Sequence, residues 1–319
     1  MNTCSPEPGA RSPELRTILA ALLALAAACS RGTDARPVAA NASEFNADSA
    51  MSYVRQQVAF GPRVPGSEGW RRTGDWIAQR LRATADTVIE QRWTHRLEDG
   101  RPLPQRNLFA RFRPGAAERV LYVAHWDTRP TADLEADPAD RQKPIPGAND
   151  GASGVALLLA VADALKKRAP ALGVDLLFVD GEDYGTWGPP DIDVLLGSTY
   201  FAAHLPDSAY RPLFGVLWDM IGDAELNIPQ ELHSAQQAPE VVQRVWQKAK
   251  DLGYERWFLP DARSYSITDD HYPLLKAGLR VIDVIDIDYP HHHRLSDTVD
   301  KVTAKSLQIV GDVAMALLR

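Results

Sequence analysis

Four short, mainly apolar runs, separated by segments with helical spacing, constrain the fold of this chain most strongly. The runs cover residues 120–124, 174–179, 214–218 and 281–287. Such runs are typical of strands that are buried on both faces, as in parallel sheets. Parallel strands need crossover connections, which are usually helical. We therefore predict an α/β fold, a three-layer sandwich around a central mixed, mainly parallel and twisted sheet.

The segments around these runs indicate one domain with helices packed on its sheet. Apolar residues have helical spacing in residues 50–58, 70–83, 153–167, 239–252 and 303–318. Residues 87–93 and 107–112 alternate in the way that strands do. No internal repeat or later change of composition divides the chain. We predict a single domain over residues 49–319, because about 270 residues are enough to build a hydrophobic core.

The N-terminal segment has the pattern of an export signal. Residues 18–28 are mainly apolar, follow Arg11 and Arg16, and end in small residues directly before Cys29. The stretch is too short to span a bilayer and resembles a bacterial lipoprotein signal. We predict a signal peptide over residues 1–28, lipidation of Cys29 and a flexible tether over residues 29–48. An uncleaved apolar tail is the alternative.

Composition limits the expected partners and location. The formal net charge is −7 and the chain has no Lys/Arg-rich run, which argues against nucleic acid and against a polybasic membrane patch. We expect contact with the membrane through the lipid only. Such a lipoprotein lies on the periplasmic or cell-surface side of a bacterial membrane, and Ser30 after the cysteine favours the outer membrane.

Acidic residues and histidines mark the ends of the predicted strands. Ligands bind outside the carboxyl ends of the strands in open α/β sheets. Imidazole and carboxylate groups together are a ligand set that zinc selects. The sequence therefore predicts a metal centre, and its candidate residues are His125, Asp150, Glu182, Asp183, Asp219 and His293.

Each candidate also has an ordinary structural explanation when taken alone. His125 can cap a strand end, and Asp150, in a glycine-rich turn, can cap the helix that follows. The acids at 180–183 can form a solvated turn, and the histidines at 291–293 can form a surface cluster. It is their order along the chain that favours the metal centre.

Neighbouring residues suggest supporting roles. Asp127 lies two positions after His125, and a carboxylate beside a ligating histidine fixes its tautomer. Asp269 is a candidate ligand or orienting group. Trp187 and Trp218 lie beside the acids and are candidates for the wall of an apolar substrate pocket, with core packing as the alternative.

Longer motifs around these residues are similar to those of the zinc exopeptidase superfamily, which contains aminopeptidases and animal-type glutaminyl-peptide cyclotransferases. The resemblance covers nearly all of residues 50–319. Several stretches resemble the bacterial glutaminyl cyclases within this superfamily: HWDTRP (125–130), PGANDGASGV (146–155), DGEDYG (180–185), LGS (196–198), WDMIG (218–222) and ITDDHY (267–272).

The resemblance implies a role for each site residue. A cyclase would hold one zinc ion with Asp150, Asp183 and His293 and would use Glu182 as its proton shuttle. Asp219 and Asp269 would complete a carboxylate hydrogen-bond network. The substrates would be peptides or proteins with N-terminal glutamine.

Two positions depart from the cyclase pattern. His292, which we expect in the substrate pocket, stands where cyclases usually have tryptophan. Asp283 stands where the animal enzymes have histidine.

The same ligands also suit a two-zinc aminopeptidase. His125 and Asp219 would then hold a second ion, and Asp150 would bridge both ions. Glu182 would activate a water between them. A third alternative is a catalytically inactive lipoprotein that uses this fold to bind peptides. We predict a zinc-dependent cyclase, because the flanking motifs favour it.

Overall fold

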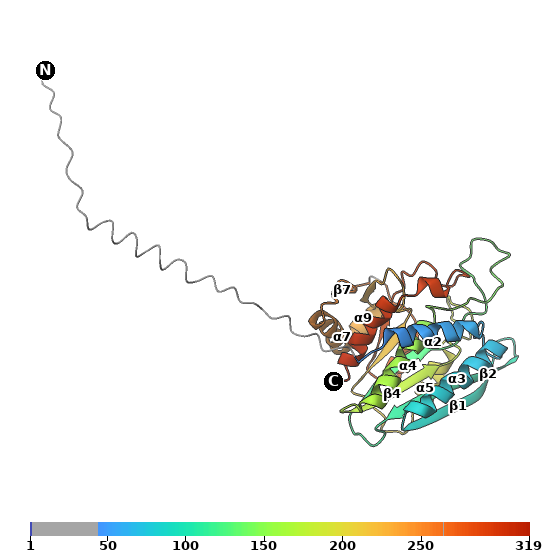
Figure 1. The fold of residues 1–319 in the computed structure, drawn as a ribbon. Coiled ribbons are helices and arrows are strands. Elements are labelled where there is room, and N and C mark those ends of the chain that lie inside the picture. The colour runs from blue at the N-terminus through green and yellow to red at the C-terminus, as the bar shows by residue number, and fades with distance from the viewer. Residues whose placement is uncertain (2–43, 264) are drawn as a thin grey trace. The chain divides into compact units, whose positions relative to one another are not determined.

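A mixed six-stranded sheet forms the centre of the fold in the computed structural model (Figure 1), which describes residue 1 and residues 44–263 and 265–319. Residues 43–319 form one compact unit. The strand order is β1-β2-β4-β3-β5-β8, in which β1 and β2 are antiparallel to their neighbours and β4, β3, β5 and β8 are parallel. The strands are β1 (Thr87–Arg96), β2 (Pro102–Phe112), β3 (Arg119–His125), β4 (Gly173–Val179), β5 (Phe214–Asp219) and β8 (Val281–Ile285).

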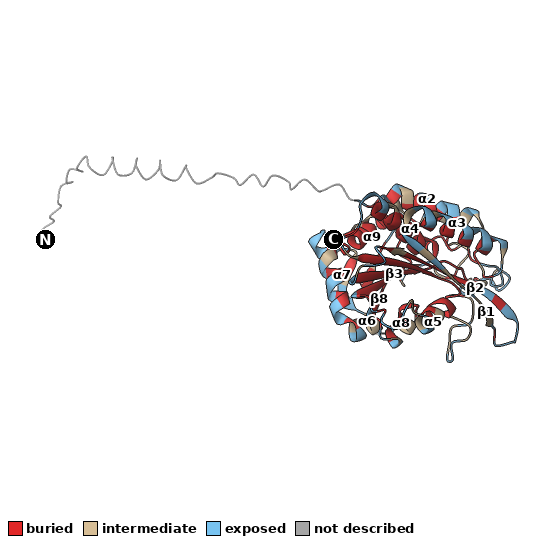
Figure 2. Cartoon of the chain, turned by 90° about the horizontal axis from the view of Figure 1, so that it is seen from below, coloured by how far each residue is buried: buried red, intermediate tan, exposed pale blue. Residues whose placement is uncertain are grey.

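Helices cover both faces of this sheet (Figure 2). One face carries α2 (Ala47–Ala59), α3 (Glu68–Thr84), α4 (Ala152–Lys167) and α9 (Ala304–Ala316). The other face carries α5 (Leu196–Ala203), α6 (Leu232–Gln237) and α8 (His271–Lys276). Helix α7 (Pro239–Asp251), the short 3-10 helix η1 (Val299–Lys301) and a small parallel sheet of β6 (Ile228–Gln230) and β7 (Phe258–Ala262) complete the domain. The predicted three-layer α/β sandwich is confirmed.

Alternation along the central strands produces two hydrophobic cores. In β3, Tyr122 belongs to the larger core under α2, α4 and α9, whereas Leu121 and Val123 belong to the smaller core with Phe201 of α5 and Leu274 of α8. Successive side chains in a strand point to opposite faces. Because both faces are buried, almost every position of β3, β4, β5 and β8 is apolar, which is the pattern that predicted them.

Close packing of α4 on β5 brings two candidate site residues together. A Cβ atom on Gly154 of α4 would lie 2.1 Å from the carbonyl oxygen of Trp218, so only glycine allows this approach. Gly151, just before the helix, has a φ of 88°, which also favours glycine. The two glycines therefore place Asp150, at the start of α4, beside the carboxyl end of β5.

The structure differs from the predicted elements at the N-terminal boundary. Helix α2 begins at Ala47, Asn46 caps it by accepting a hydrogen bond from the Ser49 amide, and Phe45 is 4% exposed within the main core. Phe45 packs against Gly311 of α9. Residues 45–48, which we predicted as tether, therefore belong to the folded domain. The predicted signal peptide after Met1, and Cys29, lie outside the described residues.

Smaller differences concern short elements. The sequence pattern did not predict α5, α6, α8, β6 or β7. Helices α6 and α8 have only six residues each. Strand β8 ends at Ile285 rather than at residue 287. Within the described ranges, no helix has the length and apolar character needed to cross a membrane.

Candidate metal centre

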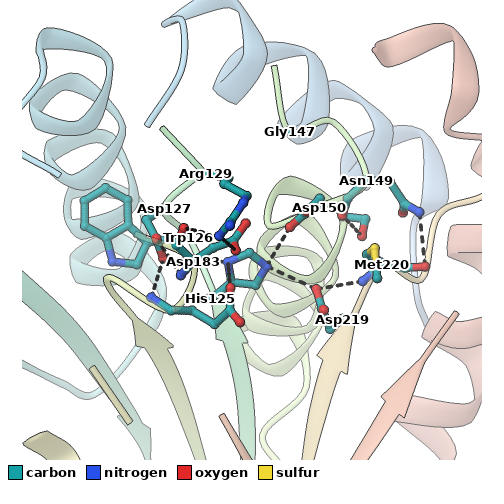
Figure 3. A network of polar contacts seen from close by, with 12 residues as sticks. His125, Trp126, Asp127, Arg129, Gly147, Asn149, Asp150, Asp183, Asp219 and Met220 are labelled. Atoms are coloured by element: carbon teal, nitrogen blue, oxygen red, sulfur yellow. Dashed lines mark hydrogen bonds and ion pairs between the residues drawn. The ribbon is translucent and has the colours of Figure 1, made fainter. Parts of the chain in front are cut away.

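The predicted site residues come together at the carboxyl ends of the parallel strands, and Figure 3 shows four of them, namely His125, Asp150, Asp183 and Asp219. His125 ends β3, Asp219 ends β5, and Glu182 and Asp183 follow β4. Asp150 precedes α4, and His293 comes from the loop after β8. All are buried, with exposures between 1% for His125 and 8% for Glu182 and His293. Residues from distant parts of the chain thus meet at one edge of the sheet.

Asp150 lies between two imidazole rings. Its Oδ1 is 3.3 Å from His125 Nε2, and its Oδ2 is 3.9 Å from His293 Nε2. The same Nε2 of His125 lies 3.1 Å from Asp219 Oδ1. Among residues 44–263 and 265–319, Asp150 is therefore the one carboxylate close to both His125 and His293, as a shared metal ligand would be.

Asp183 and His293 form the second half of the site. Asp183 Oδ1 lies 3.2 Å from His293 Nε2 and accepts hydrogen bonds from Arg129 at 3.0 Å and from the Trp187 indole at 3.1 Å. Burial disfavours the charged form of His293, but the carboxylates of Asp183 and Asp133 outweigh burial and raise its pKa to about 10. The ring is thus held in a strongly anionic setting, which also attracts a metal cation.

Glu182 sits deep in the site in a form suited to carrying a proton. Burial, followed by the neighbouring Asp183 carboxylate, raises the pKa of Glu182 well above its usual range. Its Oε2 lies 3.6 Å from His125 Nδ1. A carboxyl group whose pKa is raised toward neutrality is matched to proton transfer at ordinary pH.

One carboxylate fixes the backbone of both acids after β4. The Glu182 amide donates to Asp127 Oδ1 at 3.1 Å, and the Asp183 amide donates to Asp127 Oδ2 at 3.3 Å. Asp127 Oδ1 also lies 3.6 Å from His125 Nδ1. Asp127 is fully buried, so it is an orienting residue for three site residues at once.

Unpaired donor atoms fit a metal ion. Asp150 Oδ2 and Asp183 Oδ2 are buried, and neither accepts a hydrogen bond from any described residue. Leaving buried polar atoms unpaired is costly unless another partner satisfies them. Two groups of donor atoms lie within 4.8 Å of one another, namely Asp150, His292 and His293, and His125, Asp150 and Asp219. Carboxylate oxygens and imidazole nitrogens are the donors that suit zinc.

A cavity of about 380 Å³ opens onto these residues. Its polar lining includes Asp150, Glu182, Asp219, Asp269 and His293. Its apolar wall is formed by Leu134, Trp187, Met220, Ile267, Ile285 and Ile287. A small pocket with an apolar wall and a few convergent polar groups is typical of a substrate site.

A second buried cluster lies behind the cavity. Donor atoms of Asp269, His271 and Asp283 lie within 4.8 Å of one another, and all three residues are at most 3% exposed. Burial, followed by Asp219 for Asp269 and by Asp269 for Asp283, raises the pKa of both carboxyls well above the usual range. Protons on these carboxyls reduce the repulsion among acids packed in a dry interior.

Comparison with known proteins identifies the family. The model of peptidase family M28 matches residues 107–318. The chain belongs to peptidase family M28. Two solved structures from Bacteroides thetaiotaomicron are similar to this M28 chain, a glutaminyl cyclase bound to N-acetylhistamine and a leucine aminopeptidase precursor. Their TM-scores are 0.82 and 0.83 at 37% and 36% identity, and each match covers 86% of this chain and 97% of the other.

A curated relative points in the same direction. The glutaminyl-peptide cyclotransferase of Bos taurus is 28% identical over 291 residues, which cover 79% of this chain and 77% of the relative. The resemblance to glutaminyl cyclases that the motifs indicated is thereby confirmed, as is the zinc exopeptidase-like fold.

Most of the predicted site residues of this M28 chain lie together, but Trp218 does not. Trp187 and His292 line the cavity. Trp218 is fully buried in the main core, where it meets Tyr122 edge to face with ring centroids 5.4 Å apart. It precedes Asp219 in β5, and adjacent strand residues face opposite ways. Because Asp219 faces the cavity, Trp218 faces α4, and its predicted place on the pocket wall is wrong.

Sequence reasoning missed two charged residues that support the candidate ligands. Asp133 Oδ1 lies 3.4 Å from His293 Nδ1, and Asp133 accepts hydrogen bonds from Arg129 at 2.9 and 2.7 Å. Arg129 in turn donates to Asp183. The two residues therefore connect His293 with Asp183. The sequence signal for this ion pair is weak: Arg129 and Asp133 have opposite charges and lie four residues apart.

Arg63 was also missed. It is fully buried, and its guanidinium donates to the carbonyl oxygens of Pro146 at 2.5 Å, Gly147 at 2.6 Å and Asp150 at 3.3 Å. It therefore holds the glycine-rich loop that carries Asp150. Arg63 belongs to the turn-rich segment FGPRVPGS (60–67), and an arginine in a turn is normally exposed.

Proposed function

We propose that this chain is a zinc-dependent glutaminyl-peptide cyclotransferase, which converts the N-terminal glutamine of peptides or proteins to pyroglutamate and releases ammonia. The observation that carries the proposal is the similarity to a solved glutaminyl cyclase over 86% of this chain, at 37% identity. The site geometry supports it, because a buried carboxyl group with a raised pKa faces a small, largely apolar cavity beside the candidate zinc ligands.

We assign the zinc ion to Asp150, Asp183 and His293. The unpaired oxygens of Asp150 and Asp183 support this assignment, and three protein ligands leave one position open, as in catalytic zinc sites. When bound, zinc would polarise the carbonyl of the glutamine side chain. Asp133 would orient His293, and Arg129 would orient Asp183.

Glu182 would move the proton. The N-terminal amine of the substrate attacks the side-chain amide carbon, a new carbon–nitrogen bond closes the ring, and the bond to the amide nitrogen breaks. Glu182 accepts the proton that the attacking nitrogen loses and returns it to the leaving nitrogen, which departs as ammonia. Asp219 and Asp269, which line the same cavity as Glu182, would hold the proton network in place.

The apolar wall would favour cyclisation over hydrolysis. Trp187, Ile267 and Ile287 enclose the space beside the polar lining. Cyclisation does not use water as a reactant. A cavity that excludes water therefore leaves the N-terminal amine as the nucleophile that attacks the side-chain amide carbon.

A two-zinc aminopeptidase is the second candidate. It is favoured by the ligand group His125, Asp150 and Asp219, and by the similarity to a leucine aminopeptidase precursor. Asp150 would then be shared between two ions. The two candidates use the same cavity but leave different products.

Mass spectrometry of a peptide that begins with glutamine tests the proposal. We expect loss of one ammonia with every residue retained. Release of the first residue would instead support the aminopeptidase. Glu182→Gln should lower the rate by roughly 10²- to 10⁴-fold. Glu118→Gln makes the same chemical change at an exposed position before β3, at the opposite end of the sheet, and should leave the rate unchanged.

We also propose that the chain is exported and anchored to the outer membrane by lipid on Cys29, after removal of residues 1–28. The apolar stretch before Cys29 supports this. Radiolabelled palmitate fed to expressing cells should label the wild type and not Cys29→Ala. Equal labelling of both would contradict lipidation at this residue.

A further inference from the structure

His292 lies against the candidate zinc ligands more closely than a residue of the pocket wall needs to. One of its ring nitrogens is within 4.8 Å of donor atoms of both Asp150 and His293, which also lie within 4.8 Å of each other. Donor atoms that share a zinc ion lie at most about 4.2 Å apart, which is twice a zinc–donor bond. The upper bound of 4.8 Å is close to this spacing, so the three side chains are near enough to share one ion.

The backbone places two successive histidines on the same side. His293 has a φ of 52°, in the left-handed region. The His292 amide donates to the Tyr289 carbonyl at 3.2 Å, and the Arg294 amide donates to the His291 carbonyl at 3.1 Å. This tight turn leaves the rings of His292 and His293 only 3.8 Å apart between centroids. A non-glycine residue in this conformation is strained, and such residues often occur at functional sites.

The third histidine of the run is engaged elsewhere. His291 Nδ1 lies 2.8 Å from the hydroxyl of Ser296, and its ring packs edge-on against Tyr289. His292 has no corresponding hydrogen bond from either ring nitrogen to any described residue. The buried Asp150 Oδ2, also without a hydrogen-bond partner, belongs to the residue that His292 approaches. His292 is therefore the histidine that remains free to take up a metal ion beside His293.

We propose that His292 is a fourth protein ligand of the zinc ion. The proposal rests on the zinc site of the proposed function and adds to it. In the absence of substrate, His292 completes a four-coordinate set with Asp150, Asp183 and His293. It gives up its position when the carbonyl oxygen of the substrate arrives. The resting enzyme thus holds its zinc more tightly than three ligands alone would, and the substrate must displace an imidazole in order to bind.

Two matched variants test this ligand. His292→Phe keeps an aromatic ring in the cavity and removes both nitrogens, while His291→Phe makes the same change one residue earlier, away from the site. Competition with a zinc chelator should show His292→Phe binding zinc at least about tenfold more weakly than the wild type. His291→Phe should bind zinc as the wild type does. Equal zinc affinity of all three proteins would overturn the proposal.

X-ray absorption at the zinc edge gives a second reading that needs no variant. We expect two imidazole ligands in the zinc-loaded wild type without substrate, and one when a glutamine-initiated peptide is bound. A single imidazole in the substrate-free wild type would refute the proposal even if His292→Phe does not fold. Because neither measurement uses turnover, a protein that fails to cyclise peptides would contradict the proposed function and leave this ligand assignment intact.

Discussion

Replacing Arg63 by methionine should destabilise the domain by removing the support of the Asp150 loop. The guanidinium makes its two shortest hydrogen bonds to the carbonyls of Pro146 and Gly147, at 2.5 and 2.6 Å; Arg63 and Gly147 are buried, and Pro146 is half-buried. Hydrogen bonds from a charged group contribute about 1.5–3 kcal/mol each. Methionine removes the buried charge, which recovers part of the cost of burying it. We therefore expect the free energy of unfolding to fall by about 3 kcal/mol, the lower end of the sum for the two hydrogen bonds.

Denaturant unfolding followed by fluorescence measures this loss. A change of about 3 kcal/mol should also lower the melting temperature by roughly 6–12 °C. Arg71→Met is the matched control, because Arg71 lies on α3 and pairs only with Glu68 at the surface, where both side chains are about 60% exposed. That variant should lose less than about 1 kcal/mol. If both variants unfold at the wild-type midpoint, the structural role assigned to Arg63 is incorrect.

Two further substitutions test the surroundings of the site. Asp133→Asn should weaken zinc binding about 10- to 100-fold in a chelator competition, because it removes the carboxylate beside His293, whereas Asp137→Asn on the same loop should not. Burial raises the pKa of Asp286 from 3.8 to about 7, so the folded state binds the proton on this carboxyl more tightly than the unfolded chain does. The Asp286 carboxyl therefore lowers the stability of the fold as the pH rises from about 4 to about 7. Asp286→Asn should therefore gain stability relative to the wild type over that range in denaturant titrations, and a constant difference would contradict the raised pKa.

The strands and the candidate ligands were predictable from the sequence because burial leaves a strong pattern. Strand β3 is buried along its whole length, and its residues are apolar from Val120 to Ala124, directly before His125, where the strand ends. Ligands at strand ends can be predicted without knowing any long-range contact, because parallel strands end at the same edge of the sheet. The position of His125 beside Asp219 followed from the topology alone.

Residues that act through side-chain contacts across the fold were not predictable in this way. Arg63 is distant in sequence from the carbonyls it binds, and only the folded structure shows that a turn has become buried. Helices α6 and α8 are too short to display a helical period. Phe45 lies directly before α2, and its core contact with Gly311 joins segments that are far apart in the sequence.

The double anchorage of Asp127 has a consequence for redesign. This one carboxylate accepts hydrogen bonds from the amides of both Glu182 and Asp183, so the backbone positions the proposed proton carrier and a proposed zinc ligand as a single unit. A mutation that moves the backbone of Glu182 or of Asp183 would therefore displace both residues. An effort to evolve new substrate preferences should therefore leave the turn after β4 untouched and vary Leu134, Ile267 and Ile287, whose side chains shape the cavity without supporting that turn.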